Sequence, residues 1–187
     1  RRVLGEDHQY TLSSMRNLAL VLGEQGKWEE AERMQRQVLE RMRRVLGEHD
    51  QDTLRSKTNL ARVLEDQCKW QEAENMRREV LKDRRRALGE DHPYTLDSMQ
   101  ILGEVFYKQG KWQEAEKMLV DVLEAMRRVL GKDHQDTLST MNNLAVVFGR
   151  LGKLQEAETM HREVLEAIGE NHHQSLDIMK NLAHSFK

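Results

Sequence analysis

The chain is built from one sequence unit that returns every 42 residues. The segment 1–8, which reads RRVLGEDH, recurs in closely related form at 43–50, 85–92 and 127–134. Aligned over a full period, the first and fourth copies are identical at 27 of 42 positions. A period of about 20–50 residues is typical of repeat architectures, in which each unit packs mainly on its neighbours. The repeat therefore restricts the fold more than any other feature.

Each unit has the pattern of two helices. Within the first unit, apolar residues recur twice at helical spacing, and a glycine, Gly26 or Gly47, follows each run. The pattern predicts one helix over about 11–25 and a second over about 28–46. Neither helix can bury its apolar stripe alone, so each pair must fold back on itself and stack on the next pair.

The repeat boundaries predict one continuous array over 1–187. We expect units at about 9–46, 51–88, 93–130 and 135–168, a final single helix at 174–187, and a segment 1–5 that ends a preceding unit.

Composition excludes several classes of protein. The 30 basic and 32 acidic residues leave a net charge of −2, which gives no electrostatic reason to expect nucleic acid or an anionic membrane surface as a partner. No apolar run approaches the roughly 18 residues of a membrane span. The single cysteine, Cys68, excludes an internal disulfide framework and fits a reducing, cytoplasmic setting.

The histidines and carboxylates do not predict a metal or catalytic site. His8, His92, His134 and His172 occupy equivalent connectors about 20 Å apart, or two helix diameters. Zinc needs ligands about 2 Å from one point, so these side chains are expected to cap helices. The sequence has no nucleophile elbow and no glycine-rich phosphate loop. We therefore predict no catalytic residue, metal or cofactor, and no enzymatic activity.

Two further motifs specify a close helical hairpin. Small residues on both helices let the axes approach, and a large aromatic residue just past the turn fills the wedge between them. The motif G-K-W-E-E-A-E and its variants occur at 26–32, 68–74, 110–116 and 152–158, and N-L-A occurs at 17–19, 59–61, 143–145 and 181–183.

With these motifs the units resemble tetratricopeptide repeats of the 42-residue kinesin-light-chain type, which also occur at the C-terminal end of NB-ARC and NACHT receptor proteins. The resemblance implies an all-α fold, a right-handed superhelical solenoid of antiparallel helix pairs. It also implies a non-enzymatic module that binds a protein or peptide along the concave face. The expected parent is a multidomain receptor, with this array as its sensor or scaffold part. A kinesin-light-chain-like cargo adaptor and a structural spacer or self-association array, joined through the array ends, remain as alternatives.

The same resemblance places the first helix of each pair on the inner face. Asparagine amides there can donate to and accept from the backbone of an extended peptide, or can bond neighbouring helices, and both interpretations stay open. Charges on this face are mixed, so no carboxylate clamp is assigned. The tryptophans at 28, 70 and 112 and the phenylalanines at 106 and 148 are expected in the core. The expected partner-binding residues are Arg16, Asn17, Asn59, Arg62, Gln100, Glu104, Tyr107, Asn142, Asn143, Arg150, Lys180 and Asn181.

Overall fold

The computed structural model describes residues 5–168, and in this part of the chain all regular structure is helical. The second helix begins and ends where the sequence predicts, and the first begins two residues earlier than expected. The predicted final helix at 174–187 and the segment at 1–4 lie outside the described residues. The described helices are α1 (Gln9–Glu24), α2 (Trp28–Leu46), α3 (Gln51–Asp66), α4 (Trp70–Leu88), α5 (Pro93–Lys108), α6 (Trp112–Val129), α7 (Gln135–Arg150) and α8 (Leu154–Ile168).

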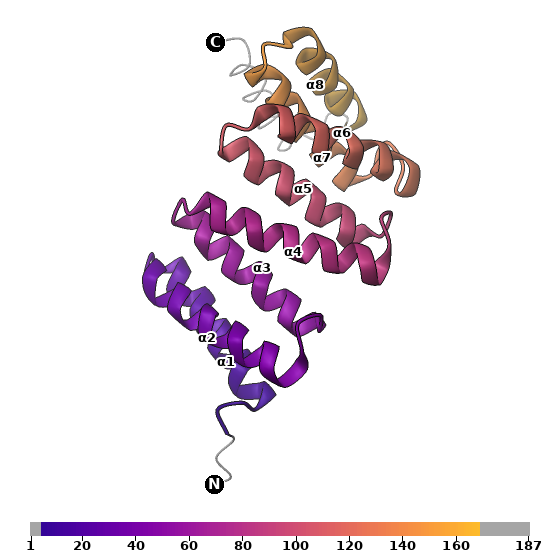
Figure 1. The fold of residues 1–187 in the computed structure, drawn as a ribbon. Helices are drawn as coiled ribbons and strands as arrows, with labels where there is room; N and C mark the ends of the chain where they lie inside the picture. The colour runs from indigo at the N-terminus through magenta and orange to yellow at the C-terminus, as the bar shows by residue number, and fades with distance from the viewer. Residues whose placement is uncertain (1–4, 169–187) are drawn as a thin grey trace. The chain divides into compact units, whose positions relative to one another are not determined.

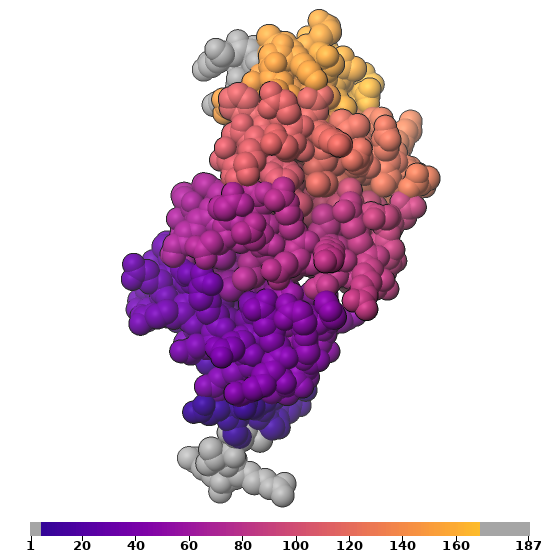
Figure 2. Space-filling view, in the orientation of Figure 1, coloured from indigo at the N-terminus to yellow at the C-terminus, as the bar shows by residue number. Residues whose placement is uncertain are grey.

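The helices form two compact units, Arg1–Asp83 and Arg84–Lys187, with the boundary inside α4. In the first unit α1 packs on α2 and α2 on α3, and in the second α5 packs on α6, α6 on α7 and α7 on α8 (Figure 1). First helices also contact each other, α1 with α3 and α5 with α7. Side chains fill the spaces that the ribbons leave between such neighbours (Figure 2). This order of consecutive antiparallel pairs is that of a helical repeat array.

Connector side chains begin the first helix of each pair. The imidazole Nδ1 atoms of His8, His92 and His134 each accept a hydrogen bond of 3.2 Å from the backbone amide two residues later. The second connector has His49-Asp50 where the other connectors have Asp-His, and there the side chain of Asp50 accepts a hydrogen bond from the backbone amide of Asp52 at 2.8 Å. The capping role predicted for the histidines is confirmed for these three. The cap satisfies a backbone donor that has no partner within the helix.

The turn between paired helices needs a left-handed backbone. Gly26, Gly110 and Gly152 have φ of 74°, 75° and 75°, values that cost glycine little. Cys68 occupies the same position with φ of 59°, the only non-glycine residue with positive φ between residues 5 and 168. The second repeat therefore forms the same turn although Cys68 replaces the glycine.

Small residues bring the two axes of each pair together. Ala19 and Ala31 in the first pair, and Ala61 and Ala73 in the second, are fully buried. In the third pair the first-helix position is Gly103, where an added Cβ would lie 2.9 Å from Leu119 Cγ. A larger side chain at these positions would force the helices apart.

The tryptophans lie at the edge of the hairpin and not in its core. Trp28 and Trp70 are only partly buried, and Trp112 is 37% exposed. Trp28 covers Gly23 at the end of α1, where an added Cβ would be 3.3 Å from the indole. The expectation of core tryptophans was therefore wrong: the indole of Trp28 lies against the end of the first helix but stays partly exposed. Phe106 and Phe148 are buried as expected.

Neighbouring pairs are joined by a leucine cluster. Leu39 of α2 packs with Leu60 and Leu64 of α3 and Ala73 of α4. A second cluster, formed by Leu12, Val38 and Met42, holds α1 against α2. One face of α2 thus packs on α1 in its own hairpin, and an adjacent face packs on α3 in the next hairpin. The same helix therefore fixes the position of its neighbours on both sides.

Ala73→Leu tests this packing. The new side chain would overfill the cluster around Leu39 and should lower the free energy of unfolding by about 1–3 kcal/mol. Urea denaturation, read at constant m-value, measures the effect. Ala87→Leu on an exposed position of the same helix is the matched control and should change stability little. Equal midpoints for Ala73→Leu and the wild type would contradict the assigned interface.

A buried lysine gives the second pair a feature that the other pairs lack. Lys57 is 1% exposed, and its ammonium group lies 2.5 Å from Glu48, 3.3 Å from Glu79 and 3.5 Å from Asp83. Burial alone would lower the pKa of Lys57, but its hydrogen bonds to Glu48 and Glu79 outweigh burial and raise it. The positions one and two repeats later are Met99 and Met141. The lysine is therefore held as a cation by carboxylates from the connector and from α4.

Lys57→Met and Asp83→Ala form a double-mutant cycle around this cluster. Lys57→Met leaves three carboxylates without the cation that they share, and Asp83→Ala removes one of the three carboxylates that hold Lys57, so each change should cost about 1–3 kcal/mol of stability. The double variant restores the Met–Ala combination of later repeats and should cost at least about 1 kcal/mol less than the sum of the single changes. Strictly additive urea midpoints would show that Lys57 and Asp83 do not stabilise each other.

Candidate functional site

The candidate site is the polar side of the first helices. Within each unit two first helices lie in contact, α1 beside α3 and α5 beside α7. The expected residues therefore fall into two groups, each spread over a neighbouring pair of helices. Lys180 and Asn181 lie outside the described residues.

In the first unit a carboxylate gathers donors from two helices. Asp52 accepts from Arg55 at 2.5 Å and from Gln9 at 3.3 Å, and Arg16 approaches it at 3.6 Å. Arg16 is buried, and its Nη1 atom has no hydrogen-bond partner among the described residues. Burial, and then the charge of Arg55, lower the pKa of Arg16, while Asp52 acts in the opposite direction. Two guanidinium groups thus share one carboxylate between α1 and α3.

Three other expected residues of the first unit keep unused hydrogen-bonding groups. Asn17 and Arg62 are exposed and Asn59 is partly exposed. Between residues 5 and 168, none of the three side chains forms a hydrogen bond or ion pair. Since Asn17 and Asn59 lie on the contacting helices α1 and α3, the first unit presents two free amides on one side.

In the second unit the equivalent asparagine is already bonded. Asn143 donates to Glu104 at 2.7 Å, across from α7 to α5. Gln100 donates to the same carboxylate at 3.4 Å and accepts from Thr140 at 2.9 Å. These contacts form a closed network between the two first helices. For Asn143 the structure therefore favours the interpretation in which the amide bonds a neighbouring helix.

The difference between the two asparagines follows from one variable position. The residue that accepts from Asn143 is Glu104, and its equivalent opposite Asn59 is Leu20, which has no acceptor in its side chain. The free amide of Asn59 thus results from an apolar residue one repeat earlier.

The remaining expected residues of the second unit lie on the same two helices. Arg150 of α7 donates to the phenol oxygen of Tyr107 on α5 at 3.1 Å. The side-chain oxygen of Asn142 is buried and has no hydrogen-bond partner among the described residues. Sequence reasoning did not name Asp52 or Thr140 as site residues. Thr140 lies three residues before the expected residue Asn143 on the same helix, and that spacing was the available signal.

The two asparagines give a direct stability test. Asn143→Ala removes a hydrogen bond to a carboxylate and should cost about 1–2 kcal/mol. Asn59→Ala removes no such bond and should stay within about 0.5 kcal/mol of the wild type. Urea denaturation of both variants checks this contrast, and equal losses would contradict the assigned bonding.

The described residues contain no cluster of three or more histidine, cysteine, aspartate or glutamate side chains that could hold a metal. A cavity of about 680 Å³ lies in the second unit and is lined by charged residues of both signs and by Leu138, Met141 and Ala167. Arg127 and Glu163 in its wall pair with each other at 3.1 Å. The cavity occupies the position that Lys57 and Asp83 fill in the first unit. Its lining resembles a gap between repeats more than a reaction site.

One buried titratable group stands apart. His161 of α8 is fully buried, and neither ring nitrogen has a partner among the described residues. Burial lowers the pKa of His161, so the imidazole is neutral near pH 7. It does not line the cavity described above.

From residue 5 to residue 168, no helix is both long and apolar enough to cross a bilayer.

The fold and this polar side define an all-helical repeat array of the kind that generally serves as a non-enzymatic interaction scaffold. The tetratricopeptide repeat family model matches residues 1–44, 10–86, 52–127 and 100–168, so the chain belongs to the tetratricopeptide repeat family. No curated protein matches the chain significantly.

Solved structures agree with this assignment. A single-residue variant of a Podosopora anserina protein, described as a kinesin light chain with nearly identical TPR-like repeats, is 24% identical with a TM-score of 0.83, covering 98% of this chain and 88% of that one. A second structure of the Podosopora anserina protein is 25% identical with a TM-score of 0.82, covering 96% and 87%. BtubC (BKLC) from P. vanneervenii is 21% identical with a TM-score of 0.78, covering 95% and 72%. The array is thus a tetratricopeptide solenoid of the kinesin-light-chain type.

Proposed function

We propose that this chain binds a peptide or protein segment on the polar side of its first helices. The observation that carries the proposal is the pair of free amides, Asn17 and Asn59, on the contacting helices α1 and α3. An extended peptide exposes backbone donors and acceptors that such amides can satisfy without reading the sequence. Arg62, which is exposed and forms no ion pair among the described residues, adds attraction for an acidic side chain in the bound segment.

The second unit supplies a different contribution. There Glu104 and Asn143 are bonded to each other, while Arg150 is exposed and joined to Tyr107. A closed network stiffens the surface, and stiffness reduces the entropy lost on binding. We infer that contact residues such as Tyr107 and Arg150 act on a surface that is already ordered.

Peptide selection tests the proposal. A peptide selected from a random display library on the wild-type chain serves as the probe. Asn17→Ala and Asn59→Ala should each weaken its binding roughly fivefold to tenfold, as expected for the loss of one backbone contact. Titration calorimetry measures the affinity, and circular dichroism checks that helicity is unchanged.

Asn75→Ala is the matched control, because Asn75 is an exposed asparagine on the second helix α4. It should leave the affinity unchanged. If the selected peptide binds both first-helix variants as tightly as the wild type, this surface is not the binding site.

For the wider context we propose the sensor or scaffold part of a multidomain, cytoplasmic receptor, with a kinesin-light-chain-like cargo adaptor as the alternative. The near-identical repeats support the first, and the exposed free thiol of Cys68 suits a reducing compartment. The coding sequence around this segment discriminates. A phosphate-binding loop upstream would favour the receptor, and upstream heptads would favour the adaptor.

A further inference from the structure

The cavity of the second unit lies at the junction of two repeats. Its walls come from the end of α6, the connector that follows it, the first half of α7 and the end of α8. Its volume of about 680 Å³ falls within the roughly 300–1,000 Å³ of ligand pockets. The cavity is therefore large enough for a small molecule or for a long side chain.

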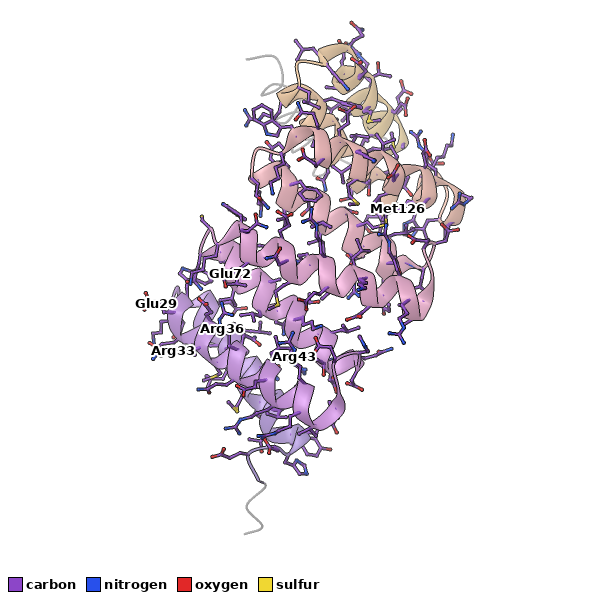
Figure 3. All side chains as sticks on the ribbon, in the orientation of Figure 1. Glu29, Arg33, Arg36, Arg43, Glu72 and Met126 are labelled. Atoms are coloured by element: carbon purple, nitrogen blue, oxygen red, sulfur yellow. The ribbon has the colours of Figure 1, made fainter. Side chains whose placement is uncertain are left out.

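The first unit fills the equivalent space with a side chain of its own. Lys57 of α3 is 1% exposed, and its ammonium group reaches three carboxylates, those of Glu48, Glu79 and Asp83. Arg43 of α2, which is labelled in Figure 3, lies 2.8 Å from Glu48 and 3.6 Å from Glu79. An aliphatic stem that ends in an ammonium group thus occupies this space among carboxylates.

The two places are enclosed by equivalent elements but differ in their charge balance. In the first unit, with His49 neutral, the equivalents of the charged lining positions hold three cations and three carboxylates: Arg43, Lys57, Lys82, Glu48, Glu79 and Asp83. The cavity is lined by two cations and three carboxylates: Arg127, Lys132, Asp133, Glu163 and Glu166. The cavity thus lacks one positive charge relative to the filled space, and a cation is the complementary occupant.

Two carboxylates of the cavity keep unused charge. Glu163 pairs with Arg127 at 3.1 Å. The side chains of Asp133 and Glu166 are exposed, and among the described residues neither forms an ion pair or a hydrogen bond. Lys132, exposed on the same connector as Asp133, can neutralise one of the two. One carboxylate is then left for an incoming cation.

The cavity also has an apolar wall beside these charges. Met141 is 2% exposed, Leu138 is partly exposed, and Ala167 stands where the first unit has Asp83. The sulfur of Met141 accepts from Arg127 at 3.6 Å. An unbranched alkyl chain can lie on Leu138 and Met141, because the methionine side chain adapts to irregular shapes. The lining therefore suits an alkyl chain that ends in a cation, which is the chemistry of the side chain that fills the first unit.

We propose that the cavity of the second unit binds a primary alkylammonium group. The alkyl chain lies on Leu138 and Met141, and the ammonium group pairs with Glu166 or Asp133, as Lys57 pairs with its carboxylates in the first unit. The group comes from a free amine or from a lysine side chain of a bound protein. This site is separate from the amides of the proposed peptide site, which lie on α1 and α3.

NMR titration of the whole chain with n-butylamine tests the proposal. The amide signals of Leu138, Met141 and Ala167 should shift saturably, with a dissociation constant of about 1–10 mM, as expected for so small a ligand. n-Butanol has the same alkyl chain without the charge and should bind at least about tenfold more weakly. Equal binding of the two compounds, or no saturable shift with n-butylamine, would overturn the proposal.

Variants of the lining separate this site from weak binding elsewhere. Met141→Lys supplies an ammonium group from the chain itself, as Lys57 does in the first unit, and should abolish the binding of n-butylamine. Glu166→Gln should weaken binding at least about fivefold, and Lys132→Gln, which removes a competing cation, should strengthen it about threefold. Glu156→Gln is the matched control, because Glu156 is an exposed residue of the same helix that does not line the cavity. Unchanged affinity in both Met141→Lys and Glu166→Gln would contradict the site, and unfolding midpoints confirm that the variants are folded.

Two further ligands distinguish the sources of the ammonium group. Tighter binding of 1,4-diaminobutane would support a free amine as the natural occupant, whereas tighter binding of Nα-acetyl-lysine methylamide would support a lysine side chain. Failure of both compounds to bind would overturn the proposal, since each carries the alkylammonium group that the cavity is inferred to recognise.

Discussion

The close approach of paired helices at small residues is the constraint on which the rest of the structure depends. Ala19, Ala31, Ala61 and Ala73 are fully buried because nothing larger fits between the two axes. Once the axes are fixed, Leu39 meets Leu60 and Leu64, and the next pair is placed. Within each unit, the position of a repeat is thus set by the repeat before it.

The packing positions are the same from repeat to repeat, but a few other positions carry different residues and make the repeats differ in their polar contacts. The position of Lys57 holds methionine in the later repeats, and the charged cluster gives way to a cavity where Met141 and Ala167 replace Lys57 and Asp83. Leu20 and Glu104 likewise decide whether the asparagine of the next repeat is free or bonded. Substitutions at such positions change a surface without changing the scaffold, because the small and leucine positions remain in place.

This separation explains why a repeat array suits recognition better than catalysis. The buried positions are used for stacking, and the groups left over are amides, guanidinium groups and carboxylates spread along neighbouring helices. Shared partners keep the carboxylates ionised, as the lowered pKa values of Glu32 and Glu48 show. For Glu48 burial alone would raise the pKa, but Lys57 and Arg43 lower it. Groups held in this way contribute binding contacts and register more readily than proton transfer.

The sequence by itself determined the helical repeat, the turns and the caps, because these depend on local spacing: a glycine or Cys68 at the turn, a histidine or Asp50 before the first helix. The placement of the first helices on the inner face came from the resemblance to tetratricopeptide repeats and stays a prediction. Only the tertiary structure decided that Asn143 is bonded and Asn59 is free, since that depends on a residue one repeat away. The same holds for the exposure of Trp112, which is 37% exposed although the pattern places it beside the turn.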